Sequence, residues 1–171
     1  MGNARFEFQE NSYYHIYNRG FEKQTLFFHD TDYKKFYDTV IYAQKLFPEI
    51  KICSYSFLPN HFHFVVHNLE TGLKMSDFMR RIQVTYAMYF KRKYETGLSA
   101  KKKPVFEGRF HAKHIDDETY LAQCIAYVNF NPLKHELVSE IDQYPWTSYH
   151  QLSSKQKLEQ YQDMILTELE Y

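Results

Sequence analysis

The sequence has little of what marks a membrane, secreted or zinc-binding protein. No long apolar run is present, so no segment is expected to span a membrane, and residues 1–9 lack the apolar stretch of a signal peptide. The two cysteines, Cys53 and Cys124, lie far apart in apolar stretches and form no Cys-x-x-Cys pattern. We expect both to be buried, reduced thiols, as is usual in a cytoplasmic protein.

A net charge is also lacking, because 21 Lys and Arg residues balance 21 Asp and Glu residues. This balance argues mildly against a protein that contacts nucleic acid over its whole surface. The charges are unevenly distributed, however. The window 80–109 contains nine basic residues and only two acids, Glu95 and Glu107. The sequence therefore predicts a polarised molecule with one basic region.

Aromatic residues are in excess: 16 Tyr, 15 Phe and one Trp make up 19% of the chain. Most of them are expected in the core, and some are suited to stacking on unpaired bases. No repeat, low-complexity tract or Pro/Gly-rich linker divides the 171 residues, which suffice for one domain. We expect a single domain with a core at about 12–150 and a tail with a short helix at 151–171.

Strand-like and helix-like patterns alternate along the chain. Strands are expected at 13–19, 50–57, 61–67 and 105–115, with the middle two forming an antiparallel hairpin. Helices are expected from Thr31 to Pro48, from Ser76 as N-cap to about Gly97, and from Asp116 to Asn131, where Pro132 should end the helix. This order predicts an α+β fold of the ferredoxin-like (RRM-like) kind, with helices packed on an antiparallel sheet.

The segment His61-Phe62-His63 opens the third predicted strand, directly after a Pro-Asn turn. Side chains two residues apart on a strand project from the same face, so both imidazoles can reach one divalent ion. With nine histidines in the chain, this spacing also arises by chance. Two half-exposed histidines that bind nothing are the simplest alternative.

Tyr127 and Asn131 lie four residues apart on the third predicted helix and are therefore neighbours on successive turns. A phenol beside a bound cation can act as a nucleophile, because the ion stabilises charge on the attacked phosphate. The amide oxygen of Asn131 is a suitable ligand for Mg²⁺ or Mn²⁺. Packing is the default role of a tyrosine, so spacing alone does not single out Tyr127.

Four segments in order resemble the single-tyrosine HUH transposases, which include insertion-sequence transposases and REP-associated tyrosine transposases. The segments are YHIYNRG at 14–20, LPNHFHFVVH at 58–67, VFEGRFH at 105–111 and AYVNFNPLKHELV at 126–138. The resemblance covers roughly residues 12–150 and implies an HUH endonuclease fold. It implies that His61 and His63 are the metal-binding pair, Asn131 the third ligand and Tyr127 the nucleophile. Insertion-sequence members tend to have Gln in place of Asn131, and the YPWTSY tail looks more like the REP-associated branch.

The resemblance implies an enzyme dependent on Mg²⁺ or Mn²⁺ that nicks and joins single-stranded or hairpin DNA. Tyr127 would attack a phosphodiester, form a 5′-phosphotyrosine and release a 3′-hydroxyl, which can later reseal the bond without ATP. The implied location is the cytoplasm of a prokaryote, in association with the nucleoid. Whether the protein acts as a monomer or a homodimer stays open. The acceptor of the phenol proton is also open, with His111 and water as candidates.

Basic residues of the window 80–109 and of the resembling segments are candidates for contact with DNA. Contacts with phosphate give salt-sensitive affinity that is independent of sequence, whereas the alternative for each residue is a solvated surface. We expect His67 to pack or to support the ligands. The candidates for DNA contact are Arg19, Arg80, Arg81, Lys91, Arg92, Lys101, Lys102, Lys103, Arg109 and His111.

Two other function classes fit part of the sequence. A silent binding module on the same scaffold would stack bases on its aromatic residues, bind hairpin DNA without a metal and never cut it. A metal hydrolase of another kind would need carboxylates near the histidine pair or HExxH-like spacing, and the sequence has neither. The transposase-like enzyme therefore ranks first.

Overall fold

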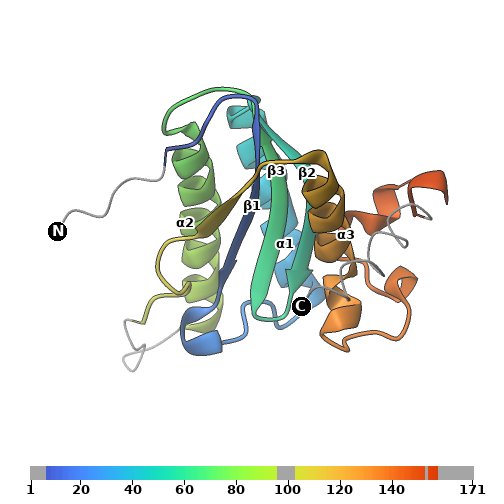
Figure 1. Ribbon diagram of the computed structural model, residues 1–171. Coiled ribbons are helices and arrows are strands. Elements are labelled where there is room, and N and C mark those ends of the chain that lie inside the picture. The colour runs from blue at the N-terminus through green and yellow to red at the C-terminus, as the bar shows by residue number, and fades with distance from the viewer. Residues whose placement is uncertain (1–6, 96–102, 153, 158–171) are drawn as a thin grey trace.

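The computed structural model describes residues 7–95, 103–152 and 154–157 and contains one antiparallel sheet of four strands (Figure 1). The elements are β1 (Ser12–Arg19), α1 (Asp30–Leu46), β2 (Ile50–Leu58), β3 (His61–Asn68), α2 (Lys74–Tyr94), β4 (His111–Ile115) and α3 (Glu118–Lys134). The strand order is β2-β3-β1-β4, which confirms the expected α+β, ferredoxin-like arrangement. None of the described helices combines the length and apolarity that a membrane crossing requires.

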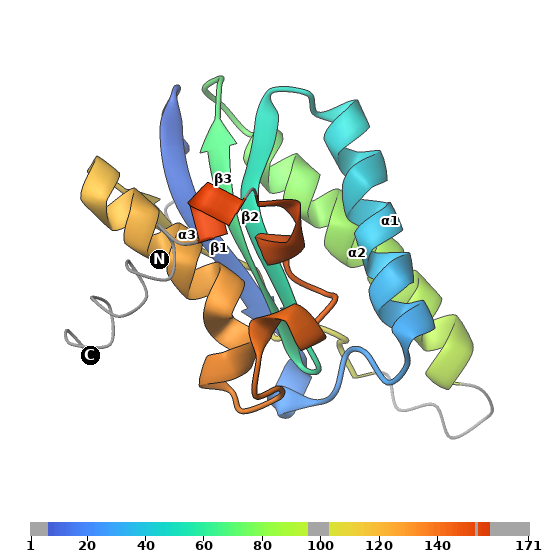
Figure 2. The same ribbon diagram turned by 90° about the vertical axis from the view of Figure 1, so that its right-hand side faces the viewer.

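The sheet separates two layers of helices. Helices α1 and α2 cover one face, and α3 covers part of the other (Figures 1 and 2). Because side chains alternate along a strand, Phe62 and Phe64 of β3 enter the core beneath α1 and α2, whereas Val65 packs against α3. His61 and His63 share the face of Val65. The hydrophobic alternation of β3 thus directs both histidines towards α3.

Helix α3 covers only one side of its face of the sheet. It packs chiefly on β2 and β3, and Figure 2 shows it crossing the strands obliquely. The end of β1 and the start of β4 consequently lie beside α3 rather than beneath it. Tyr17 and His111 occupy this open corner of the sheet, and both are exposed.

The segment that follows α3 docks on the edge of the sheet through the YPWTSY residues. The Tyr144 hydroxyl donates to the backbone oxygen of Phe57 at 2.6 Å, and the Trp146 ring stacks on Tyr33 at 5.1 Å. The Ser148 and Ser54 hydroxyls both bond to the amide oxygen of Asn129 on α3. Residues 154–157 are helical, and the remainder of the expected tail helix lies outside the described residues. The YPWTSY motif therefore has a structural role: it fixes the segment after α3 to the edge of the sheet.

Three predicted boundaries, two of helix α2 and one of strand β4, are wrong. Helix α2 begins at Lys74 with Leu73 as its N-cap, so Ser76 is not the cap, and it ends at Tyr94, before Gly97. The predicted strand 105–115 is shortened to β4, because the chain turns at Gly108, whose φ is +68°. Before this turn, Phe106 is buried in the core. Among the described residues, pairing before the turn is limited to an isolated antiparallel bridge between Phe106 and Gly20, so the strand-like alternation there reflects mainly packing.

Pro132 does not end the third helix, contrary to the prediction. Helix α3 continues to Lys134 with Pro132 inside it. Proline lacks only its own N–H, so near the end of a helix it removes a single bond. The backbone N–H of His135 still bonds to Asn131 O at 3.0 Å, and that of Leu137 to Pro132 O at 3.0 Å. Asn131 is thereby held in a helical turn.

Cys124 is buried as expected, whereas the prediction for Cys53 is wrong because its side chain is exposed. The register of β2 against β3 shifts between Ile52 and Ser54. Such a bulge leaves one residue without a partner and turns it away from its neighbours. An apolar stretch in the sequence cannot reveal this local shift.

Asp32 forms a buried ion pair that links α1 to α2. Its side chain is 0% exposed and accepts hydrogen bonds from Lys93 Nζ at 2.6 Å, the Tyr94 hydroxyl at 2.5 Å and the Tyr89 hydroxyl at 2.7 Å. Burial acts to raise the pKa of this carboxyl, but these bonds, with one from the His29 N–H, bring it well below its ordinary value. The ionised form is therefore the one that stabilises the fold.

We expect Asp32→Ala to lower the free energy of unfolding by about 3 kcal/mol, because Lys93 and two phenols lose a buried partner. A lowered pKa in the folded state means that this contribution is complete above the unfolded pKa of about 3.9 and is lost as the pH falls below it. Urea titration at neutral and acidic pH measures both effects. Asp38→Ala, which removes an exposed ion pair on the same helix, should change stability by less than about 1 kcal/mol. An equal effect of the two substitutions would contradict this role of Asp32.

Candidate active site

His61 and His63 stand at the start of β3 on the face towards α3, with ring centroids 5.1 Å apart. The preceding turn at Pro59 and Asn60 brings them to the rim of the sheet. His63 is only 7% exposed, and His61 is half-buried. The structure thus places the predicted pair side by side beneath the C-terminal half of α3.

Hydrogen bonds orient both imidazoles. His61 Nδ1 lies 2.6 Å from the amide oxygen of Asn60, which can only accept, so Nδ1 carries the hydrogen and Nε2 keeps its lone pair. His63 Nδ1 lies 2.9 Å from His15 Nε2. When His63 donates in this pair, its Nε2 is likewise free to bind a cation. Metal-binding histidines are commonly oriented by such a bond at the second nitrogen.

The environment of the two imidazoles keeps them neutral. The pKa of His61 is lowered to about 4, chiefly by burial and then by the nearby His135 and Arg19, and only Asn131 opposes them. Burial also lowers the pKa of His63, and His15, His61 and His135 act in the same direction. Neutral imidazole is the form that binds a divalent metal. At neutral pH the pair is therefore ready to coordinate without losing protons.

The side-chain amide of Asn131 is buried without a hydrogen-bond partner among the described residues, which indicates that the site binds a ligand. The Asn131 side chain is 0% exposed, and within the described part of the chain neither its amide oxygen nor its amide nitrogen has a hydrogen-bond partner. It lies close enough to His61 to affect the pKa of that imidazole. A buried amide without partners costs about 1–3 kcal/mol, so such groups usually bind something.

The donor set fits a divalent cation. Two imidazole nitrogens and one amide oxygen converge, which leaves further coordination positions for phosphate oxygens. In the described ranges no group of three His, Cys, Asp or Glu residues has the arrangement of a metal site. The third donor beside the two imidazoles is the neutral amide of Asn131.

The structure places Tyr127 next to the histidine pair. Its half-buried ring meets His63 and His15 edge-on, with ring centroids 5.9 Å away in each case. The Lys134 ammonium lies 4.8 Å from the centroid of the Tyr127 ring. Tyr127 thus lies between the histidines and the apolar cluster that contains Val65 and Val128, and a cation accompanies it.

Several residues of the site are not among the sequence predictions. His15 bonds to His63, the His135 ring lies 4.9 Å from His61, and Tyr17 pairs with His63 across the strands. The period of two along β1 puts residues 13, 15 and 17 on one face, which was the available signal. That signal gains meaning only once the pairing of β1 with β3 is known.

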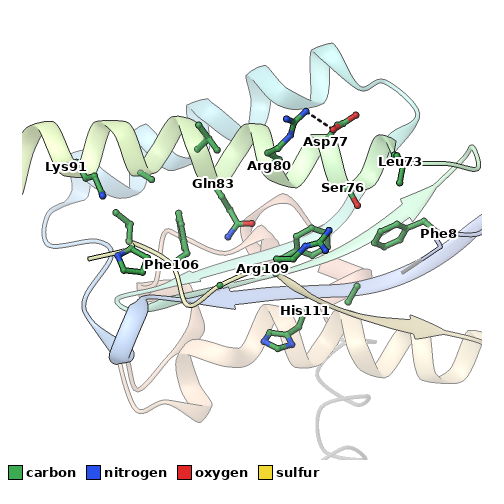
Figure 3. Close-up of a pocket in the computed structure, with 17 residues that line it drawn as sticks. Phe8, Leu73, Ser76, Asp77, Arg80, Gln83, Lys91, Phe106, Arg109 and His111 are labelled. Atoms are coloured by element: carbon green, nitrogen blue, oxygen red, sulfur yellow. Dashed lines mark hydrogen bonds and ion pairs between the residues drawn. The ribbon is translucent and has the colours of Figure 1, made fainter. Parts of the chain in front are cut away.

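Four of the predicted DNA contacts line one groove between α2 and the chain that leads into β4 (Figure 3). Arg80 and Lys91 lie on the same side of α2, Arg109 lies across the groove from them, and His111 borders the groove with its ring turned to the α3 side of the sheet. Arg80 is also paired with Asp77 at 2.8 Å. We call this hollow the α2–β4 groove; it is lined by Phe8, Leu73, Ser76, Asp77, Arg80, Gln83, Val84, Ala87, Lys91 and residues 104–106 and 108–112.

The other predicted DNA contacts lie elsewhere. Arg81 is placed over the Tyr42 ring of α1, and Arg92 is exposed outside the groove. Arg19 is paired with Glu107, and Lys103 with Glu22 at 2.6 Å. Lys101 and Lys102 lie outside the described residues. His67 stacks on Tyr13 at 4.2 Å and therefore has the packing role expected for it.

Comparison with known proteins agrees with this fold. The family model described as "Transposase IS200 like" matches residues 8–131. A solved REP-associated tyrosine transposase bound to a REP hairpin superposes with a TM-score of 0.72 at 18% identity, covering 88% of this chain and 84% of that one. At this identity the likeness shows the fold alone.

Two further solved structures are more distant. A tRNA(His) guanylyltransferase from Saccharomyces cerevisiae has a TM-score of 0.51 at 12% identity, covering 75% of this chain and 62% of that one. A transposase-like protein from Deinococcus radiodurans has a TM-score of 0.49 at 11% identity, with 75% and 95% covered. None of the curated protein sequences matches the chain significantly. The resemblance drawn from the motifs is confirmed by the family model, which spans most of the chain and favours an enzyme over a silent binding module: the protein belongs to the IS200-like transposase family.

Proposed function

We propose that this transposase cuts single-stranded DNA through attack of Tyr127 on a phosphodiester held at His61, His63 and Asn131. The observation that carries the proposal is the buried, unpartnered amide of Asn131 beside two oriented imidazoles, with the Tyr127 ring 5.9 Å from His63. Mg²⁺ or Mn²⁺ suits this donor set. When bound, such an ion would stabilise charge on the attacked phosphate. We further propose that the protein acts in the cytoplasm of a prokaryotic cell, on nucleoid DNA.

The reaction is a transesterification in which the chain supplies the nucleophile. The Tyr127 oxygen forms a bond to phosphorus, the bond from phosphorus to the 3′-oxygen breaks, and a 5′-phosphotyrosine and a 3′-hydroxyl result. A 3′-hydroxyl can later reverse the exchange, so no ATP is consumed. Lys134 supports the developing phenolate by its position near the Tyr127 ring. The imidazoles in contact with the Tyr127 ring are those of His15 and His63, which bond to each other, whereas His111 stacks beyond Tyr17. Solvent is therefore the favoured proton acceptor.

The substrate we propose is single-stranded DNA with a hairpin, since one structural relative is bound to a REP hairpin. The test is incubation of the protein with labelled hairpin DNA carrying randomised single-stranded flanks, with and without Mg²⁺ or Mn²⁺. Denaturing electrophoresis should show a protein-linked DNA product only when the metal is present. A cut product without covalent linkage, or none with either metal, would contradict the proposal.

We propose that the site works in cis, because Tyr127 and His63 of the same chain are already in ring contact. A mixture of Tyr127→Phe and His63→Ala proteins should therefore remain inactive. If the tyrosine came from a second subunit, the mixture would recover roughly a quarter to a half of the wild-type activity, as expected for paired complementary defects in a symmetric dimer. Adduct yield after mixing and incubation at high protein concentration distinguishes the two arrangements.

We propose that the α2–β4 groove binds DNA phosphates through Arg80, Lys91 and Arg109. Each change to Gln should weaken DNA binding at low salt and reduce the slope of log K against log salt by about 0.7–0.9 for each lost contact. Fluorescence anisotropy over a salt series measures the slope. Lys45→Gln removes an exposed lysine of α1 and should leave the slope unchanged. Equal effects of Lys45 and the groove residues would show diffuse binding instead.

A further inference from the structure

A column of three aromatic rings crosses the sheet from the candidate active site to its edge. Tyr17 of β1 pairs directly with His63 of β3 and with His111 of β4. The Tyr17 ring is nearly parallel to His63, with centroids 5.7 Å apart and 30° between planes, and to His111, with values of 5.1 Å and 15°. Such spacings correspond to offset stacking. The column therefore runs from His63, a candidate metal ligand, to His111 on the edge strand β4.

Exposure rises along this column. The His63 ring is buried at 7%, Tyr17 is 38% exposed, and His111 is exposed at the outer end. Helix α3 lies mainly over β2 and β3 and so leaves this corner open. In the described part of the chain, neither the Tyr17 hydroxyl nor the His111 ring forms a hydrogen bond. The His111 ring, at the outer end of the column, stacks on Tyr17 on one side and is accessible to solvent on the other.

Two arginines border the open end, and the carboxylate of Glu107, which pairs with Arg19, also lies near His111. Arg19 lies two residues beyond Tyr17 on the same strand and face, and Arg109 lies two residues before His111. His111 also lines the α2–β4 groove, and Figure 3 shows its ring on the α3 side of the sheet, away from Arg80 and Gln83. The sheet edge at His111 thus joins the groove to the site around Tyr127. Flat rings bordered by cations are the features that bind unpaired nucleotides.

We infer that the His111–Tyr17 end of this column is a stacking platform for an unpaired base close to the cleaved phosphate. The inference rests on the proposed function, since it assigns the path of the same DNA strand. The strand leaves the α2–β4 groove, passes the sheet edge and places one base against His111. Stacking accepts any base, so this subsite holds the strand in position and selects unpaired over paired DNA. The column also has a structural role, because rings that pack across neighbouring strands stabilise a sheet without any ligand.

The test separates these roles by combining protein and DNA changes. Binding of the Tyr127→Phe protein, which leaves the DNA intact, is measured by anisotropy with hairpins in which each unpaired base is replaced singly by an abasic site. At one position the abasic site should weaken binding about 5- to 150-fold, the value expected for one lost stacking contact. In Tyr17→Leu/His111→Ala protein, the intact DNA should bind correspondingly more weakly and the abasic penalty at that position should disappear. The fluorescence of a 2-aminopurine at the same position should be quenched when the DNA binds the Tyr127→Phe protein, but not when it binds the Tyr17→Leu/His111→Ala protein.

Two controls make the outcome decisive. Tyr42→Leu removes a tyrosine that is 54% exposed on α1 and should keep the full abasic penalty. Because stacking involves no counterions, the loss from the platform variant should be the same at low and high salt, unlike losses from groove arginines. The inference is overturned if no abasic site in the unpaired DNA weakens binding, or if the same abasic site weakens binding equally in the Tyr17→Leu/His111→Ala protein. Absence of a covalent adduct in wild-type protein would refute the proposed cleavage instead, because these binding measurements need no chemistry.

Discussion

Tyr127→Phe is expected to abolish the covalent attachment of DNA while leaving the fold and DNA binding intact. Removal of the sole nucleophile should reduce adduct formation by a factor of about 10⁴ or more, as in other enzymes that act through a covalent intermediate. The ring is retained, so its edge contacts with His63 and His15 survive, and stability should change by less than about 0.5 kcal/mol. Denaturing electrophoresis and thermal unfolding measure the two quantities.

Tyr120→Phe is the matched control, because Tyr120 lies two turns earlier on α3 and contacts Lys113 rather than the histidines. It should form the adduct at the wild-type rate. Mass spectrometry of the protease-digested adduct should locate the nucleotide on the peptide that contains Tyr127. A persistent adduct in Tyr127→Phe protein would move the nucleophile to another tyrosine and end the present assignment. Tyr17, the other tyrosine in ring contact with His63, would be the next candidate.

The sheet and the helices could be predicted because their hydrophobic periods are local properties. The alternation in β3 predicted that His61 and His63 share a face, and the helical spacing in α3 placed Tyr127 one turn before Asn131. In the structure these residues lie together as the family resemblance implied. The resemblance was needed, however, because spacing alone gives no reason for α3 to cross β3 at His63.

The remainder of the site depends on strand register and helix rotation, which no local pattern contains. His15 and Tyr17 join the site only through the pairing of β1 with β3. Likewise, Arg80 and Lys91 enter the groove while Arg81 does not, because neighbours along a helix point about 100° apart. The wrong ends of β4 and α3 have the same origin. Burial of Phe106 and bonds beyond Pro132 outweigh the local preference for pairing or for helix termination.

Asn131→Leu should change activity and stability in opposite directions. The substitution replaces a buried amide that has no hydrogen-bond partner with an apolar side chain of similar size. In metal-free protein this removes a cost of about 1–3 kcal/mol, so the free energy of unfolding should rise or stay constant. Cleavage should nevertheless fall about 100-fold or more, because loss of even an outer partner of a metal site costs 10- to 100-fold. Half-maximal activity should also require more Mg²⁺ or Mn²⁺.

Asn129→Leu provides the contrast within the same helix. Asn129 is also buried, but its amide oxygen accepts from Ser54 and Ser148, so the substitution removes an acceptor that both hydroxyls share and should cost about 1–3 kcal/mol. Its metal requirement should match that of the wild-type protein. Urea unfolding without metal and activity over a metal titration therefore assign each asparagine separately. A stable Asn131→Leu protein that cleaves normally at the wild-type metal concentration would remove the amide from the metal site, because only a ligand role joins gained stability to lost activity.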